Sequence, residues 1–140
     1  MTRREQRTGK SGENVAASRL RALGICMVER IGTPVKIVPG RAPIWGEKVS
    51  GDFRGILPGG RSVLVECKTV EHNLRWSDFR EHQPKALTEH AMYGGLSLVV
   101  WVHSSGAYVL DWLHLTNLLL FAPGISIAPE LARELDIESL

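Results

Sequence analysis

The chain has 140 residues, of which 44% are hydrophobic and 23% charged, and its formal net charge is +2. This length is near the commonest domain size and is sufficient to bury a core, and the composition is typical of a globular protein. The most apolar run, residues 96–102, is too short to span a bilayer, and the N-terminal segment lacks the apolar stretch of a signal peptide. We therefore expect a cytoplasmic protein with no membrane partner.

Basic side chains are concentrated near the N-terminus, at Arg3, Arg4, Arg7, Lys10 and Arg19. Such a segment can bind phosphate, although an exposed tail kept soluble by its charges is an equally good interpretation. We predict a flexible basic arm over residues 1–10, followed by a single domain over residues 11–140. Cys26 and Cys67 lie in apolar runs without metal-binding spacing, so both are predicted to be small buried side chains in a reducing compartment.

A first helix is predicted over residues 12–23, with Ser11 as its N-cap and Gly24 after its end. Glu13 falls on the apolar stripe of this helix, in the first turn. A carboxylate there either interacts favourably with the helix dipole or faces the core and needs a partner, and the sequence leaves both interpretations open. A strand over residues 25–31, a short extension over 35–38 and a loop over 39–48 follow.

The next segment predicts a hairpin. Residues 52–57 and 61–68 are strand-like and flank Pro58-Gly59-Gly60, a strong turn sequence. A three-residue loop pairs Leu57 with Arg61 and places Asp52 opposite Glu66. Lys68 then shares the face of Glu66, while the side chain of Cys67 points to the other face. Facing carboxylates repel each other, which predicts a compensating divalent cation; a solvated hairpin with outward charges is the alternative.

The remaining chain alternates between helices and strands. A polar connection over residues 70–78 precedes a helix over 82–93, with Pro84 in its first turn and Gln83 at its entry. Strands over 96–103 and 107–112, a short helix over 113–121, an edge strand over 125–127 and a helix over 129–135 follow. This order predicts an α/β domain with a mixed central sheet flanked by helices. The histidines have no zinc-ligand spacing.

The order of Glu13 on a helix, Asp52 and Glu66-x-Lys68 on two strands, and Gln83 at a helix entry resembles a known group of enzymes. These are the restriction-endonuclease-like nucleases with a split Asp…Glu-x-Lys site, and within them the chain resembles the RecU-type Holliday junction resolvases. The resemblance covers most of the chain and is carried by RTGKSGE (7–13), RIGTPVKI (30–37), SGDFRG (50–55), VECKT (65–69) and EHQ (81–83).

The resemblance implies a restriction-endonuclease-like fold and a Mg²⁺-dependent endonuclease, with Mn²⁺ as a substitute, that resolves four-way junctions by paired symmetric cuts in DNA recombination and repair. It implies metal ligands at Ser50, Asp52, Glu66 and Gln83, and a catalytic lysine at Lys68. Ser50 stands where the family commonly has threonine. The loop over residues 39–48 is shorter than the stalk with which that family engages the junction.

The chemistry agrees with this resemblance. Hydrolysis of a phosphodiester needs an activated water and neutralised phosphate charge, which Mg²⁺ held by Asp52 and Glu66 can supply. The Cys67 carbonyl is a further candidate ligand, and Lys68 is expected to orient the water or stabilise developing charge. Glu13 is expected to be a peripheral metal or water ligand, and Gln83 a ligand or a phosphate contact.

The expected partners follow from the proposed reaction. Two symmetric cuts require two sites, so we expect a homodimer acting on branched DNA, with a recombinase as a candidate partner in a bacterial or phage-encoded system. The candidate phosphate contacts are Arg3, Arg4, Arg7, Lys10, Arg41 and Lys85. Two alternatives stay open: a restriction- or repair-type endonuclease acting on ordinary duplex DNA, and a junction-binding protein without catalysis.

Overall fold

The structure, a computed structural model, describes residues 3–32, 35–36, 39–40, 44–45 and 52–140, and for residues 3–10, 35–36 and 44–45 it describes the backbone alone. Five strands form the central sheet in the order β1-β4-β5-β7-β8. They are β1 (Cys26–Arg30), β4 (Phe53–Ile56), β5 (Ser62–Thr69), β7 (Leu96–His103) and β8 (Gly106–Asp111). Neighbouring strands are antiparallel, except that β5 and β7 are parallel.

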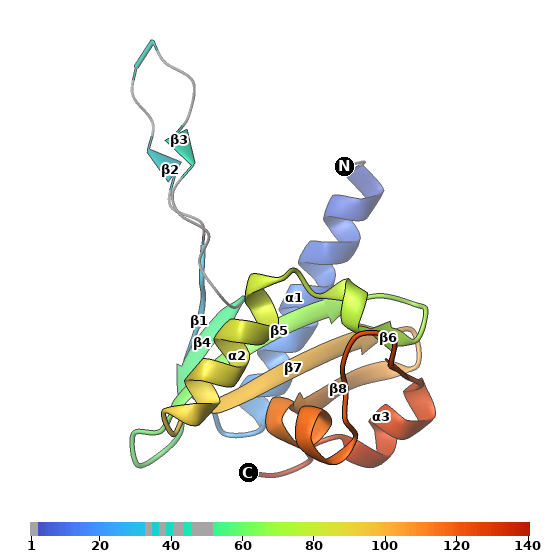
Figure 1. Ribbon diagram of the computed structural model, residues 1–140. Coiled ribbons are helices and arrows are strands. Elements are labelled where there is room, and N and C mark those ends of the chain that lie inside the picture. The colour runs from blue at the N-terminus through green and yellow to red at the C-terminus, as the bar shows by residue number, and fades with distance from the viewer. Residues whose placement is uncertain (1–2, 33–34, 37–38, 41–43, 46–51) are drawn as a thin grey trace.

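Two helices cover opposite faces of this sheet (Figure 1). On one face lies α1 (Arg3–Ala22), whose Ala16 and Leu20 are fully buried in an apolar cluster with residues of β5 and β7. On the other face lies α2 (His82–Met92), whose Leu87 is buried in a second cluster. The predicted α/β domain with a mixed sheet between helices is therefore confirmed.

The hairpin between β4 and β5 has the predicted register. Phe53 pairs with Val65, as a three-residue loop over residues 58–60 requires. Gly59 and Gly60 have φ angles of 100° and 95°, in the left-handed region that glycine adopts without steric cost. The Pro-Gly-Gly turn thus determines which residues of the two strands face each other.

The chain passes from β5 to β7 through α2. Pro84 lies in the first turn of α2 as predicted, where its missing N–H costs no hydrogen bond. Gly94 follows the helix with a φ of 94°. Because β5 and β7 are parallel, the connection must run back from the C-terminal end of β5 to the start of β7, and α2 forms this return. The first turn of α2 therefore lies beside the C-terminal end of β5.

The first helix begins earlier than predicted. Its expected start at residue 12 is wrong, because α1 already begins at Arg3. Residues 3–10 contain no proline and are rich in arginine, glutamate, glutamine and lysine, which have high helix propensity. That these residues form a separate flexible arm stays a prediction.

The prediction that both cysteines are buried is wrong for Cys26, whose side chain is exposed. The register between β1 and β4 shifts between Cys26 and Glu29, and Met27 has a φ of 53° and is 69% exposed. A bulge of this kind breaks the two-residue alternation of a strand. Side chains that the pattern assigns to the interior therefore face solvent.

A small antiparallel pair lies outside the central sheet. It joins β2 (Val35–Lys36) to β3 (Ile44–Trp45) and stands beyond the end of β1 in Figure 1. The predicted unbroken loop over residues 39–48 is therefore wrong at β3, because those two residues pair with the strand that precedes the turn. Arg41 lies outside the described residues.

The remaining elements are short. The predicted polar connection contains β6 (Leu74–Arg75), which pairs with β9 (Ser126–Ile127), and a 3₁₀ turn, η1 (Trp76–Asp78). A single π-helical turn, η2 (His114–Leu118), replaces the longer predicted helix, and α3 (Pro129–Leu135) has the predicted bounds. Among the described residues, none of the helices combines the length and apolarity that a membrane span requires.

Candidate active site

The backbone places Asp52 at the entry to β4. The strand ladder ends with Phe53 opposite Val65, so Asp52 lies just past the last pair, where the same register points to Glu66. The N–H of Asp52 donates to the Val65 carbonyl at 2.7 Å. Its carboxylate oxygen Oδ2 accepts a hydrogen bond of 2.6 Å from the N–H of Cys67. The Asp52 carboxylate is therefore held against the segment of β5 that carries Glu66 and Lys68.

Glu66 is a buried carboxylate, only 1% exposed. Such a group is costly to bury unless other groups hydrogen-bond to it or neutralise it. The amide nitrogen Nε2 of Gln83 donates to Oε2 of Glu66 at 3.2 Å. The structure thus adds a contact that the sequence does not predict, between the amide of Gln83 and the buried carboxylate of Glu66.

Gln83 connects three parts of the site. While its Nε2 contacts Glu66, its oxygen Oε1 accepts from the Lys68 ammonium at 2.7 Å and from the Arg80 backbone N–H at 2.9 Å. The Arg80 contact fixes the side chain at the start of α2. Gln83 thereby holds the carboxylate and the ammonium of the Glu-x-Lys motif in fixed positions.

Lys68 is largely enclosed. Its ammonium lies over the ring of Phe79, 4.9 Å from the ring centroid. Burial lowers the pKa of Lys68, with nearby Arg80 acting in the same direction, while Glu66 and Asp52 oppose the shift. Phe79 belongs to an aromatic cluster whose other members are Trp76, Trp112 and Phe121. Sequence analysis missed this cluster, because its members come from separate elements.

Cys67 contributes its backbone rather than its thiol. Burial, reinforced by the charges of Asp52 and Glu13, raises the pKa of the Cys67 thiol to about 12, so it stays protonated at neutral pH. The thiol is therefore a poor metal ligand, whereas the Cys67 carbonyl stays a candidate. Glu13 itself forms an ion pair with Arg30.

The remaining predicted residues are less informative. Ser50 lies outside the described residues, as do the side chains of Arg3, Arg4, Arg7 and Lys10, whose backbone belongs to α1. Lys85 is exposed and lies 3.5 Å from Glu81. Within the described ranges there is no group of three or more His, Cys, Asp or Glu side chains arranged to hold a metal ion. The carboxylates brought together here are those of Asp52 and Glu66, both of which lie close enough to Lys68 to act on its pKa.

Comparison with solved structures identifies the fold. The chain is similar to Hjc, a Holliday junction resolvase of the archaeon Archaeoglobus fulgidus, with a TM-score of 0.59 at 13% identity, over 89% of this chain and 92% of that one. A protein of unknown function from Silicibacter pomeroyi aligns with a TM-score of 0.33 at 18% identity, over 89% of this chain and 77% of that one. Neither a protein-family model nor a curated protein matches the sequence.

The predicted restriction-endonuclease-like fold is thus confirmed, with its mixed five-stranded sheet between helices. The likeness to that structure lies in the architecture, because the two sequences are only 13% identical. In this fold the C-terminal end of β5, which carries Glu66 and Lys68, lies beside the first turn of α2, which carries Gln83.

Proposed function

We propose that this protein is a Mg²⁺-dependent DNA endonuclease that resolves four-way junctions. The observation that carries the proposal is the contact of Gln83 with both the buried Glu66 and Lys68, beside Asp52. The fold supports it, because the similar structure from Archaeoglobus fulgidus is described as a Holliday junction resolvase. The sequence motifs that resemble RecU-type resolvases support the same reaction.

The oxygen donors of the site fit a hard divalent cation. Asp52 and Glu66 supply two carboxylates and Cys67 a backbone carbonyl, and oxygen is the ligand that Mg²⁺ prefers. When bound there, Mg²⁺ or Mn²⁺ would lower the pKa of a water and neutralise phosphate charge. Both contacts of the Gln83 oxygen go to protein donors, Lys68 and the Arg80 N–H. We therefore assign Gln83 a positioning role and not a ligand position.

The chain's own residues account for the other requirements of hydrolysis. The Lys68 ammonium is held by the Gln83 oxygen, where it can orient a water or stabilise charge on the phosphate. Burial of Glu66 and Lys68 strengthens each electrostatic interaction in the site. Two symmetric cuts need two such sites, so the active form is a homodimer. A recombinase partner remains part of the proposal.

A cleavage assay tests the proposal. A four-way DNA junction and a linear duplex of the same sequence are incubated with the protein, with and without Mg²⁺. We expect Mg²⁺-dependent paired nicks in the junction and little cleavage of the duplex. Glu66→Gln and Lys68→Ala should abolish cleavage while retaining junction binding, and Glu71→Gln, at an exposed position, is the control. Equal cleavage of junction and duplex would favour the restriction-type alternative. If the wild-type protein cleaves neither DNA, the proposed nuclease activity is rejected.

A further inference from the structure

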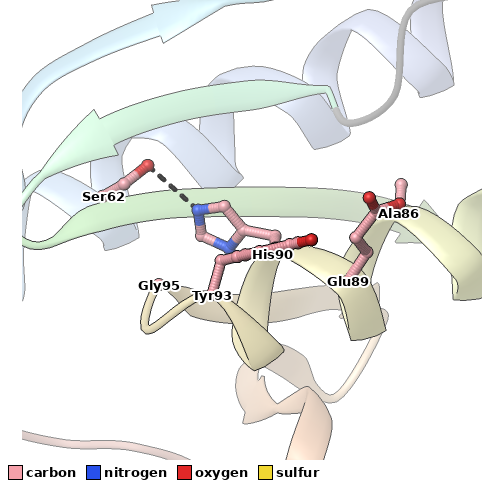
Figure 2. Close-up of a pocket in the computed structure, with 6 residues that line it drawn as sticks. All are labelled: Ser62, Ala86, Glu89, His90, Tyr93 and Gly95. Carbon is pink, nitrogen blue, oxygen red and sulfur yellow. Dashed lines mark hydrogen bonds between the residues drawn. The ribbon is translucent and has the colours of Figure 1, made fainter.

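A hollow lies at the end of α2 that is remote from Gln83. It has a volume of about 400 Å³ and is lined by Ser62, Ala86, Glu89, His90, Tyr93 and Gly95. Figure 2 shows the ring of His90 pointing from α2 toward the hydroxyl of Ser62, at the start of β5. Glu66 follows Ser62 by four residues on this strand, so the two lie roughly 13 Å apart along it. The proposed nuclease makes no use of the side chains in this hollow.

Hydrogen bonds fix the tautomer of His90. The hydroxyl of the buried Ser97 donates to the Leu87 carbonyl at 2.7 Å, so its oxygen accepts from the Nδ1–H of His90 at 2.9 Å. A neutral imidazole carries only one proton, so the other ring nitrogen, Nε2, is an acceptor. It accepts the hydroxyl proton of Ser62, with 2.9 Å between nitrogen and oxygen. The histidine is therefore in the tautomer that a base for Ser62 requires.

Packing holds the ring in this orientation. A Cβ on Gly95 would lie 2.2 Å from Cε1 of His90, so the ring occupies space that a larger residue would fill. Nucleophilic serines are activated by an arrangement of this kind, in which the hydroxyl is hydrogen-bonded to a base that a third group orients. Here Ser62 is the hydroxyl, His90 the base and Ser97 the orienting group. Because Ser62 is exposed, a molecule in the hollow can reach its oxygen.

The charges around the hollow indicate which substrate would suit it. Burial, followed by the charges of Arg54 and Arg61, lowers the pKa of His90, so the ring is neutral at pH 7 and free to accept a proton. Positive charge near the ring also favours the negative charge that develops on a carbonyl oxygen under attack. The carboxylate of Glu89, in the wall of the hollow, disfavours an anionic substrate. An uncharged carboxylic ester satisfies both conditions.

We propose that Ser62 and His90 form a second reactive site, which transfers the acyl group of a small uncharged ester to Ser62 and then to water. The Ser62 oxygen forms a bond to the ester carbonyl carbon while Nε2 of His90 takes the hydroxyl proton. The bond from that carbon to the leaving oxygen breaks, and the alcohol leaves with the proton from His90. Water, deprotonated by His90, then attacks the acyl-serine, which releases the carboxylic acid and returns the proton to Ser62.

The reaction with p-nitrophenyl acetate tests this inference. The full-length protein is mixed with the ester, the release of p-nitrophenol is followed, and mass spectrometry of acid-quenched samples locates the acetyl group. We expect the first acetyl group to appear on Ser62. Ser62→Ala should abolish this rapid reaction, and His90→Gln should slow it about a hundredfold or more, because the base is lost. Gly95→Ala keeps both reacting groups but displaces the ring, so it should slow the reaction as well.

The matched control is Ser105→Ala. Ser105 is an exposed serine whose hydroxyl also lies near a histidine, 2.8 Å from Nδ1 of His103. That nitrogen already accepts from the Ser105 backbone N–H at 3.0 Å, and the Ser105 hydroxyl lies 2.6 Å from the hydroxyl of Tyr108. We therefore expect this variant to react with the ester as the wild type does.

Two results would overturn the inference. One is equal release of p-nitrophenol by the wild type and by Ser62→Ala, and the other is unchanged release by His90→Gln. The inference does not depend on the proposed nuclease, because the two sites share no residue. Lys68→Ala should accordingly lose junction cleavage while reacting with the ester at the wild-type rate.

Discussion

The ammonium nitrogen of Lys68 lies 4.9 Å from the centre of the Phe79 ring. A cation at this distance over an aromatic face is attracted by the ring quadrupole, by about 0.5 to 2 kcal/mol depending on desolvation. Phe79 is itself held by Trp112 and Phe121, with ring centroids 5.5 and 6.0 Å away. The aromatic cluster therefore supports the side chain that we propose to act on the phosphate.

The first prediction concerns this contact. Phe79→Leu should slow single-turnover junction cleavage by about two- to thirtyfold, because the ammonium loses its aromatic support, while junction affinity stays unchanged. Phe121→Leu removes a ring from the same cluster without touching Lys68 and should cleave normally. Phe79→Tyr keeps the ring face and should restore the rate. In NMR spectra, the ε-methylene protons of Lys68 should lose their ring-current shift in Phe79→Leu alone; an unchanged shift would contradict the prediction.

A second prediction concerns Gln83. Gln83→Leu removes the group that contacts both Glu66 and Lys68, so cleavage should fall about ten- to a hundredfold, as for other residues that orient catalytic groups. Junction affinity in EDTA should change little. Glu81→Gln alters an exposed residue near the same helix entry and serves as the control. If both variants lose activity equally, the effect belongs to the helix start and not to the hydrogen bonds of Gln83.

The third prediction is a pH dependence of stability. The pKa of His90 is lowered from 6.5, chiefly by burial, so below pH 6.5 the unfolded chain binds a proton that the native state resists. The contribution of His90 to stability should therefore be complete above pH 6.5 and decline as the pH falls through the interval below it. Urea unfolding at pH 7.5 and 5.5 measures this difference. His90→Gln should reduce it, whereas His114→Gln, at an exposed position, should preserve it.

A fourth prediction concerns the contact between α1 and β5. A Cβ on Gly12 would lie 2.2 Å from the Oγ1 atom of Thr69. Gly12→Ala gains about 1 kcal/mol of helix propensity but forces an overlap that typically costs 1 to 3 kcal/mol, so we expect a net loss of stability of about 1 kcal/mol. Gly32→Ala meets no atom within 4 Å and is the control. Adding Thr69→Ala should rescue Gly12→Ala, and thermal unfolding that shows no rescue would contradict this explanation.

Local signals in the sequence predicted the backbone arrangement around the candidate site. The Pro-Gly-Gly turn determines the pairing of Phe53 with Val65, and Pro84 places Gln83 at the helix entry. Both signals act within a few residues of the feature that they determine, so they can be interpreted without the tertiary structure. The position of Asp52 against β5 follows from this strand register, whereas the hydrogen bond of Gln83 to Glu66 has no local signal in the sequence.

Other features depend on contacts between distant segments or on irregular backbone. Phe79 lies beside Lys68 in an aromatic cluster that joins η1 and the residue after it to Trp112, just after β8, and to Phe121, after η2. The exposure of Cys26 follows from a bulge at Met27, which has no signal of its own because methionine is not a residue that favours positive φ. Neither of these is present in a local pattern.

The candidate site residues lie close together in the sequence, which has a consequence for gene recombination and for the design of chimeric proteins. Asp52, Glu66, Lys68 and Gln83 all fall within residues 52–83, together with the turn that sets their register and the start of the helix that presents Gln83. One exchange of a gene segment would carry the whole set into another chain. The block lacks β7, the parallel neighbour of β5, so a recipient must supply such a strand before the transplanted groups can meet.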